Sequence, residues 1–160
     1  RAADLIGTLR RVTSLPIIAK LTPNITDITE IATHVEEAGA DAISTINTIR
    51  GMAIDISTRR PKLGAIMGGL SGPAIKPVAI AAVYQVAKRV RIPVIGIGGI
   101  SSAEDALEFM IAGATAVQVG TANFVDPRTG ATVVDGLAAW CTAADVPAIR
   151  EVIGSIELPS

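Results

Sequence analysis

Apolar runs separated by mixed segments divide the chain into short strands and amphipathic helices. Four runs rich in Ile, Val and Ala have the length and composition of buried strands, at 16–21, 41–47, 93–98 and 116–120. The segments around them carry apolar residues every three or four positions and predict helices at 2–12, 26–38, 73–89 and 102–112. A further helical region near the C-terminus contains Trp140. Strands and helices therefore alternate along the chain.

Cap and turn signals mark several of these boundaries. Thr26 takes the N-cap position of the second helix, and Gly39 ends that helix. Ser101 and Glu104 have the spacing of a capping box ahead of the fourth helix.

The segment 48–72 is much longer than the roughly two to six residues of an ordinary strand–helix connection. It contains short extended pieces, predicted at 53–56 and 63–66. We expect this long loop to be a functional cover or a surface for a partner.

The alternation predicts a parallel α/β sheet, which closes either as an open doubly wound sheet or as part of a barrel. A doubly wound nucleotide-binding sheet would carry G-x-G-x-x-G after its first strand, and this sequence has no such motif there. The glycine-rich turns follow the last two strands instead, where (β/α)8 barrels build phosphate sites after strands seven and eight. The sequence therefore favours a (β/α)8 TIM barrel, of which this chain supplies about the last four βα units.

Two of these glycine-rich turns have the composition of an anion site. Gly98 and Gly99 lie between the third strand and a helix, and Gly120 and Thr121 follow the fourth strand. Glycine amides approach phosphate oxygens closely because no Cβ intervenes, and the N-terminus of the helix that begins near 102 adds positive partial charge. Each turn could serve only to reverse the chain, but two at the same strand end favour phosphate binding. Gly72, before a proline-started helix, offers a third such site.

Polar side chains stand at the ends of the first two predicted strands. Lys20 interrupts an apolar run, which favours a fixed cation beside an anionic ligand over a lysine that only reaches solvent at the sheet rim. Asn47 closes the next strand and offers a donor and an acceptor that suit the edge of a heterocycle, although asparagine is also common in turns. Its place beside Lys20 favours ligand binding.

Composition excludes several classes of function. The 160 residues are 49% hydrophobic with a net charge near −1 and no basic run, which argues against nucleic acid and membrane surfaces as partners. No apolar run approaches the roughly 18 residues of a membrane-spanning helix, and no signal peptide is expected. The single Cys141 forbids an internal disulfide and favours a cytoplasmic location. No residues have metal-ligand spacing, so no metal site is expected.

Four long segments resemble one enzyme family. They read IIAKLTPNITDI, INTIRGMAID, GGLSGPAIKP and IPVIGIGGISSAEDALEFMIAGATAVQVGTA. Over 1–157 the chain is similar to the C-terminal half of dihydroorotate dehydrogenase catalytic subunits, with the strongest resemblance to class 1B, the NAD-linked type. The resemblance implies that residues 1–160 form the C-terminal half of a single FMN-binding TIM-barrel domain.

The resemblance also implies roles for individual residues. Lys20 would place a positive charge near the pyrimidine edge of the flavin, and Ile46 would contribute a backbone contact. Asn47 and Thr48 match the pair that holds dihydroorotate or orotate. The positions that match those binding the FMN ribityl chain and phosphate are Gly72, Gly98, Gly99, Gly120 and Thr121.

The reaction implied is oxidation of dihydroorotate to orotate in de novo pyrimidine biosynthesis, with hydride passing to FMN. The family's catalytic base lies in the other half of the barrel, so it is expected upstream of Arg1, and no catalytic residue is assigned here. Cys141 lies outside the family motif. For class 1B the resemblance implies a homodimer and a partner subunit that carries FAD and a [2Fe-2S] cluster and passes electrons to NAD.

Two other functions remain open. The FMN domain of dihydropyrimidine dehydrogenase shares TPNITDI and the GGI turn, and a non-catalytic half-barrel could retain only phosphate binding. A half-barrel leaves two sheet edges and one apolar face uncovered. We therefore expect the isolated 160 residues to be inactive and to aggregate or dimerise.

Overall fold

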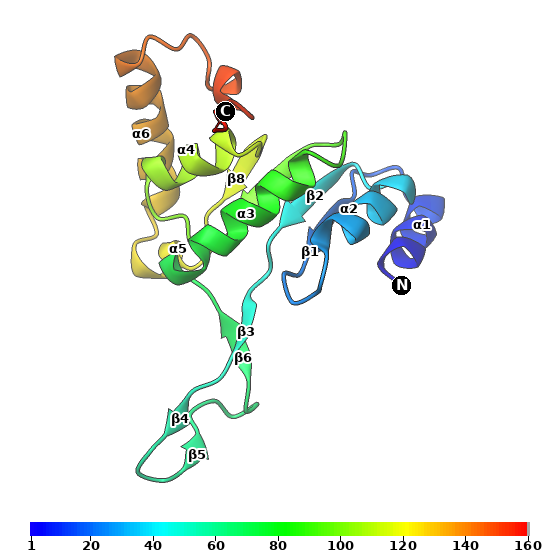
Figure 1. The fold of residues 1–160 in the computed structure, drawn as a ribbon, viewed down its shortest axis with the longest axis vertical. Helices are drawn as coiled ribbons and strands as arrows, with labels where there is room; N and C mark the ends of the chain where they lie inside the picture. The colour runs from blue at the N-terminus through cyan, green and yellow to red at the C-terminus, as the bar shows by residue number, and fades with distance from the viewer. Residues whose placement is uncertain (160) are drawn as a thin grey trace.

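Four short parallel strands form the central sheet of the computed structural model, which describes residues 1–159 (Figure 1). They are β1 (Ile18–Leu21), β2 (Ala42–Thr45), β7 (Val94–Ile97) and β8 (Ala116–Gln118). Their spatial order is β1-β2-β7-β8, so each strand lies beside the one that precedes it among the four. This order runs in one direction without the reversal that defines a doubly wound sheet.

The helices follow the predicted order along the chain. They are α1 (Ala2–Val12), α2 (Ile28–Glu37), α3 (Lys76–Ala87), α4 (Ala103–Ile111), the short α5 (Ala122–Val125) and α6 (Thr129–Ala143). A 3-10 turn, η1 (Pro73–Ile75), leads into α3, and another, η2 (Ile149–Val152), follows α6. Among the described residues every helix is too short or too polar to cross a membrane.

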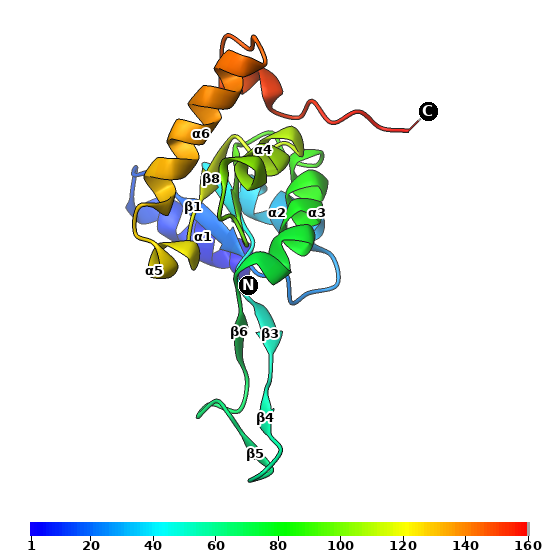
Figure 2. The same cartoon turned by 90° about the vertical axis from the view of Figure 1, so that its left-hand side faces the viewer.

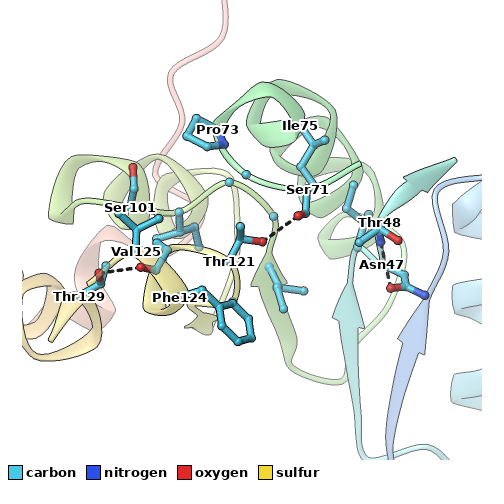
Figure 3. A pocket seen from close by; sticks show the side chains of 18 of the residues that line it. Asn47, Thr48, Ser71, Pro73, Ile75, Ser101, Thr121, Phe124, Val125 and Thr129 are labelled. Carbon is cyan, nitrogen blue, oxygen red and sulfur yellow. Dashed lines mark hydrogen bonds between the residues drawn. The ribbon is translucent and has the colours of Figure 1, made fainter. Parts of the chain in front are cut away.

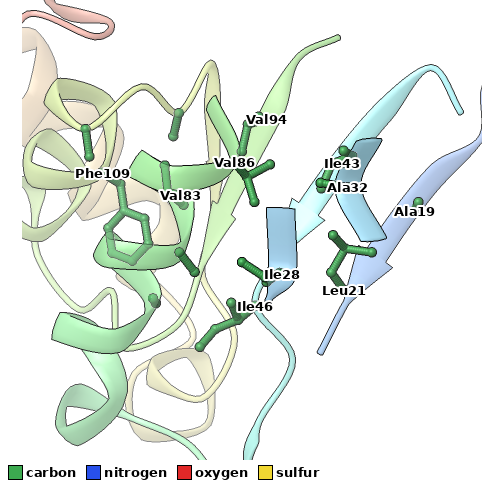
Figure 4. Packing of buried hydrophobic residues seen from close by; sticks show 14 of the residues in the cluster. Ala19, Leu21, Ile28, Ala32, Ile43, Ile46, Val83, Val86, Val94 and Phe109 are labelled. Carbon is green, nitrogen blue, oxygen red and sulfur yellow. The ribbon is translucent and has the colours of Figure 1, made fainter. Parts of the chain in front are cut away.

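The core lies between one face of the sheet and helices α2, α3 and α4 (Figure 4). Ile43 of β2 and Val94 of β7 point to this face and are buried, as alternate residues of a strand must point to opposite faces. Phe109 of α4 is fully buried against β7, where Gly96 leaves room for its ring: a Cβ on Gly96 would lie 2.4 Å from the ring. The absence of a side chain at Gly96 therefore sets how closely α4 packs.

The opposite face of the sheet is open. Ile18 and Lys20 of β1 are exposed there, and so are Ala116 and Gln118 of β8. The side chain of Ser44 is the buried polar group on this face, and its hydroxyl donates to Gln118 Oε1 at 3.0 Å across β7. The predicted α/β class with a parallel sheet is confirmed. The strands of residues 1–159 do not close on themselves, so a complete cylinder is not formed by this chain.

The long loop is a two-part β-ribbon that projects from the body (Figures 1 and 2). Strands β3 (Ile49–Gly51) and β6 (Gly68–Leu70) pair antiparallel near the body, and β4 (Ile54–Asp55) pairs with β5 (Arg60–Pro61) further out. We call residues 49–70 the arm. The prediction of an extended piece at 53–56 is confirmed by β4, but that at 63–66 is wrong, because those residues form turns and the strand begins at Gly68.

The arm exposes an unusual share of apolar side chains. Ile56 is 89% exposed, and six further large apolar residues of the arm are also exposed: Met52, Ile54, Leu63, Ile66, Met67 and Leu70. Exposed apolar patches of this kind are typical of surfaces that bind a partner. The role of the long loop as a partner surface or cover stays a prediction.

Two helix caps differ from those predicted. Asp27, not Thr26, caps α2, because its carboxylate accepts from the Thr29 amide at 2.8 Å. A carboxylate accepts this bond more strongly than a hydroxyl and also favours the positive end of the helix.

The cap of α4 is shifted by one residue from the prediction. Its capping box joins Ser102 to Asp105 rather than Ser101 to Glu104. Ser101 still takes part, since its amide and hydroxyl both donate to the Asp105 carboxylate. The prediction was wrong because both pairs have the same spacing.

Candidate functional site

A cavity of about 530 Å³ opens at the carboxyl ends of the sheet strands, between the turn after β2, η1 and α5 (Figure 3). Its volume lies within the range of small-ligand and cofactor sites, about 300–1,000 Å³. Every site residue predicted from the sequence lines it. These are Lys20, Ile46, Asn47, Thr48, Gly72, Gly98, Gly99, Gly120 and Thr121.

The glycine turns that line the cavity contain backbone N–H groups without partners in residues 1–159. Among the described residues, the amides of Gly72, Gly98, Gly99, Gly120 and Thr121 donate to no backbone carbonyl. Gly72, Gly98 and Gly99 also have φ values of +87°, +139° and +81°, which glycine adopts without strain. Unpaired amides at a strand–helix edge are the usual donors to a phosphate. The arrangement can therefore bind an anion through the main chain.

The turns after β6, β7 and β8 are held against one another. Thr121 Oγ1 donates to Ser71 Oγ at 2.8 Å, which joins the turn after β8 to the segment before η1. A Cβ on Gly99 would lie 2.9 Å from the Gly72 carbonyl oxygen, so the turn after β7 packs directly on that same segment. Ser71 stands inside the GGLSGPAIKP motif, but its side chain gave no signal of this contact in the sequence.

The turn after β2 is fixed by hydrogen bonds to its neighbours. The Asn47 amide donates to the Leu21 carbonyl at 2.8 Å, and the Thr48 amide donates to Asn47 Oδ1 at 2.9 Å. Asn24 holds the same turn from outside, because its Nδ2 donates to the Thr48 carbonyl and its Oδ1 accepts from the Arg50 amide. Asn47 thus has the turn role considered above, and its Nδ2 is not used in that turn.

Lys20 is the cation of the cavity wall. It lies in β1 on the open face of the sheet and is exposed. The five ion pairs among the described residues do not include it. An unpaired ammonium at the cavity can therefore neutralise an anionic group of a ligand.

At the opposite rim the cavity is apolar. Phe124 and Val125 of α5 line it and are 93% and 87% exposed. Thr129, which also lines it, is buried and donates to the Asp126 carbonyl at 2.6 Å. No strand or motif in the sequence marks this segment, so its place in the site is not predictable from the sequence alone.

An ion-pair cluster stands directly behind the glycine turns. Lys76 Nζ lies 2.7 Å from Asp105 Oδ1 and 2.6 Å from Glu108 Oε1. Burial works to raise the pKa of Asp105, but hydrogen bonds from Lys76 and Ser101 outweigh it and hold the pKa below its ordinary value. The same two carboxylates raise the pKa of Lys76. Asp105 and Lys76 are therefore both charged near neutral pH.

The start of α4 differs from what was expected of it. The amides of Ser101 and Ser102 donate to Asp105 Oδ2 at 2.9 and 3.1 Å. The sequence predicts that the N-terminus of this helix helps to bind a phosphate. In the structure, two of the amides there are already bound to Asp105. The free donors lie one turn earlier, at Gly98 and Gly99.

Comparison with known proteins decides the family. A family model described as dihydroorotate dehydrogenase matches residues 2–140, which is most of the chain. The chain belongs to the dihydroorotate dehydrogenase family. The resemblance read from the sequence motifs is thereby confirmed.

Individual members of the dihydroorotate dehydrogenase family give the same result. Proteins named dihydroorotate dehydrogenase B (NAD(+)), catalytic subunit, from Geotalea daltonii and Caldicellulosiruptor bescii are 54% and 52% identical to it over 157 and 155 residues. The protein of that name from Porphyromonas gingivalis is 54% identical over 155 residues. These alignments cover 97–98% of the chain but only 50–52% of each relative. The chain thus spans about half the length of the relatives it matches.

Proposed function

We propose that the cavity binds FMN and that the chain is the C-terminal half of an FMN-binding (β/α)8 barrel. The observation that carries this is the convergence of all nine predicted site residues on one cavity, with five unpaired amides in its wall. The one-directional strand order and the open sheet face also support a barrel, because a barrel closes when further strands continue the sheet and cover that face. The boundaries of the domain, 1–160 as part of one barrel, belong to the same proposal.

In this proposal the glycine turns hold the phosphate and the first two strands meet the rest of the cofactor. The amides of Gly98, Gly99, Gly120 and Thr121, with Gly72 beside them, donate to phosphate oxygens. Lys20 places its ammonium beside the flavin edge that becomes negatively charged, while Ile46 offers a main-chain contact. FMN, when bound, supplies the hydride acceptor.

The substrate class proposed is dihydroorotate and its product orotate, in de novo pyrimidine biosynthesis. Asn47 and Thr48 stand at the turn after β2, next to the Lys20 strand, where an amide and a hydroxyl can orient a planar pyrimidine. We assign no catalytic base to this chain. Cys141 lies in α6 and does not line the cavity, so the base is proposed to belong to the other half of a complete barrel.

The proposed partners follow the names of the relatives, which describe a catalytic subunit linked to NAD. We propose a homodimer that works with a second subunit carrying FAD and a [2Fe-2S] cluster. The exposed apolar side chains of the arm offer a surface for such an association. The single cysteine favours the reducing cytoplasm as its location.

The relatives favour this function over the alternatives. Three relatives with the name dihydroorotate dehydrogenase B (NAD(+)), catalytic subunit, are 52–54% identical to the chain, which supports this function. A half-barrel that keeps only phosphate binding would hold FMN without supporting turnover.

Flavin fluorescence titration tests the proposal. We expect the 160-residue chain to quench FMN fluorescence saturably and Lys20→Met to weaken FMN binding by roughly 10-fold, as loss of one charge-assisted contact predicts. Lys62→Met, which removes an exposed lysine of the arm, is the matched control and should leave FMN binding unchanged.

Turnover of dihydroorotate tests the assignment of the catalytic base to the other half of the barrel. Purified chain with added FMN should show none, since the base lies elsewhere. Absence of FMN binding would overturn the cofactor assignment, and measurable flavin-dependent turnover would overturn the assignment of the base to another segment.

A further inference from the structure

Asp105 connects the start of α4 to the turn that lines the cavity. Its Oδ2 accepts the Ser101 amide at 2.9 Å, the Ser101 hydroxyl at 2.8 Å and the Ser102 amide at 3.1 Å. Its Oδ1 accepts from Lys76 Nζ at 2.7 Å. The side chain is only 14% exposed, so water competes little with these bonds. One carboxylate thus holds two consecutive amides and a cation from another helix.

Lys76 brings the second glycine segment to the same point. It is the first residue of α3, four positions after Gly72. A Cβ on Gly99 would meet both the backbone nitrogen and the Cβ of Lys76 at 2.9 Å. The turn after β7 therefore packs directly against the start of α3. The Lys76–Asp105 ion pair joins the start of α3 to α4 beside this contact.

We infer that Asp105 and Lys76 are positioning residues for the phosphate of a bound flavin mononucleotide. This inference rests on the function proposed above. Neither residue lines the cavity, so they act through the turn at 98–101. Asp105 draws the amides of Ser101 and Ser102 towards itself, and the amides of Gly98 and Gly99 are left free for the anion.

The charge of Lys76 is needed for the same reason. A carboxylate placed close behind a phosphate site repels the ligand unless a cation offsets it. Lys76 lies between Asp105 and Glu108, and it offsets one of their two negative charges at the start of α4. Removal of this lysine leaves two uncompensated carboxylates near the anion.

Glu108 provides a matched control within the same cluster. Its carboxylate lies as close to Lys76 as that of Asp105 does, at 2.6 Å. It accepts no bond from Ser101 or Ser102, and it is exposed. If only the ion pair with Lys76 mattered, substitution of Asp105 or of Glu108 would have the same effect on FMN binding. If the hydrogen bonds to the turn matter, only substitution of Asp105 has a large effect.

The test compares FMN with riboflavin, which has the same ring system but lacks the phosphate. For Asp105→Asn and for Lys76→Met we expect FMN affinity to fall by roughly 10- to 100-fold, the loss typical of a charge-assisted contact, with riboflavin affinity within about 2-fold of the unsubstituted chain. Glu108→Gln should change both by less than about 2-fold. Amide hydrogen exchange at 98–102, measured without flavin, should be faster in Asp105→Asn than in Glu108→Gln.

The outcomes separate this inference from the proposed function. If the unsubstituted chain binds neither flavin, the cofactor assignment and the positioning role towards it both fall. If it prefers FMN and Asp105→Asn keeps the same preference and the same exchange rates, only the positioning role falls. Equal loss of FMN and riboflavin binding also overturns it, because that is what general loosening of the fold produces. Circular dichroism identifies a variant that does not fold, and Lys76→Met then decides the result.

Discussion

Alanine in place of Gly99 should destabilise the chain through two separate effects. Gly99 has a φ of +81°, where a residue with a Cβ costs about 1–2 kcal/mol. The new Cβ would also lie 2.9 Å from the Gly72 carbonyl oxygen and from the backbone nitrogen of Lys76. Backbone atoms cannot move aside as a flexible side chain does, so the turn or the start of α3 must shift, at about 1–3 kcal/mol. The expected loss in free energy of unfolding is about 2–5 kcal/mol.

Gly120→Ala is the control for this change. Gly120 also lines the cavity, but nothing lies within 4 Å of the position its Cβ would take, and its φ is not in the left-handed region. Its free energy of unfolding should stay within about 0.5 kcal/mol of the unsubstituted chain. FMN affinity should nevertheless fall, because the added methyl group would hinder the approach of the ligand to the backbone amides of this turn.

Urea unfolding followed by far-ultraviolet circular dichroism measures both variants. For a chain of this size each kcal/mol also lowers the thermal midpoint by about 2–4 °C, so Gly99→Ala should melt clearly earlier. The reasoning fails if Gly99→Ala and Gly120→Ala unfold at the same urea concentration. It fails equally if Gly120→Ala is the less stable of the two.

Three further predictions concern buried and charged groups. Thr45→Val should raise the free energy of unfolding by about 1 kcal/mol, because the Thr45 hydroxyl is buried with no hydrogen-bond partner among residues 1–159. Thr129→Val should lower it by about as much, because that hydroxyl donates to backbone carbonyls; equal thermal midpoints would contradict both statements. The stability that Asp105 provides should be complete above about pH 5 and disappear as the pH falls through its lowered pKa, which lies below 3.8. Urea midpoints of the unsubstituted chain and Asp105→Asn should therefore converge at low pH, and a constant difference down to pH 2 would exclude this linkage.

Local sequence patterns were sufficient to predict the four strands of the sheet and nine residues of the cavity wall, but not α5 at its rim. The apolar strands are bounded by glycines and prolines, and the cavity residues lie where parallel strands end. Lys20 and Asn47 meet at one edge because parallel neighbouring strands bring their carboxyl ends together. The strand order alone is therefore enough to predict that residues at the carboxyl ends of neighbouring strands lie close together.

The exact helix cap, the strand register of the arm and the contacts between distant side chains could not be predicted in this way. Asp27 and Thr26 are adjacent and both are good cap residues, so the sequence alone does not show that α2 begins after Asp27. The pairing of Ile49 with Leu70 in the arm depends on a ribbon of more than twenty residues with several possible registers. The cluster around Asp105 joins residues 29 positions apart, a distance over which sequence patterns carry no contact information.

The arm has both of its roots in the wall of the cavity. Its outgoing strand begins at Ile49, directly after Asn47 and Thr48, and its returning strand ends at Leu70, directly before Ser71 and Gly72. The ribbon continues directly into these residues, so a displacement of the ends of the ribbon would also displace them. A protein that bound the ribbon and moved its ends would therefore change the affinity for a ligand in the cavity. Thermodynamic reciprocity then requires the ligand to change the affinity of the ribbon for that protein by the same factor.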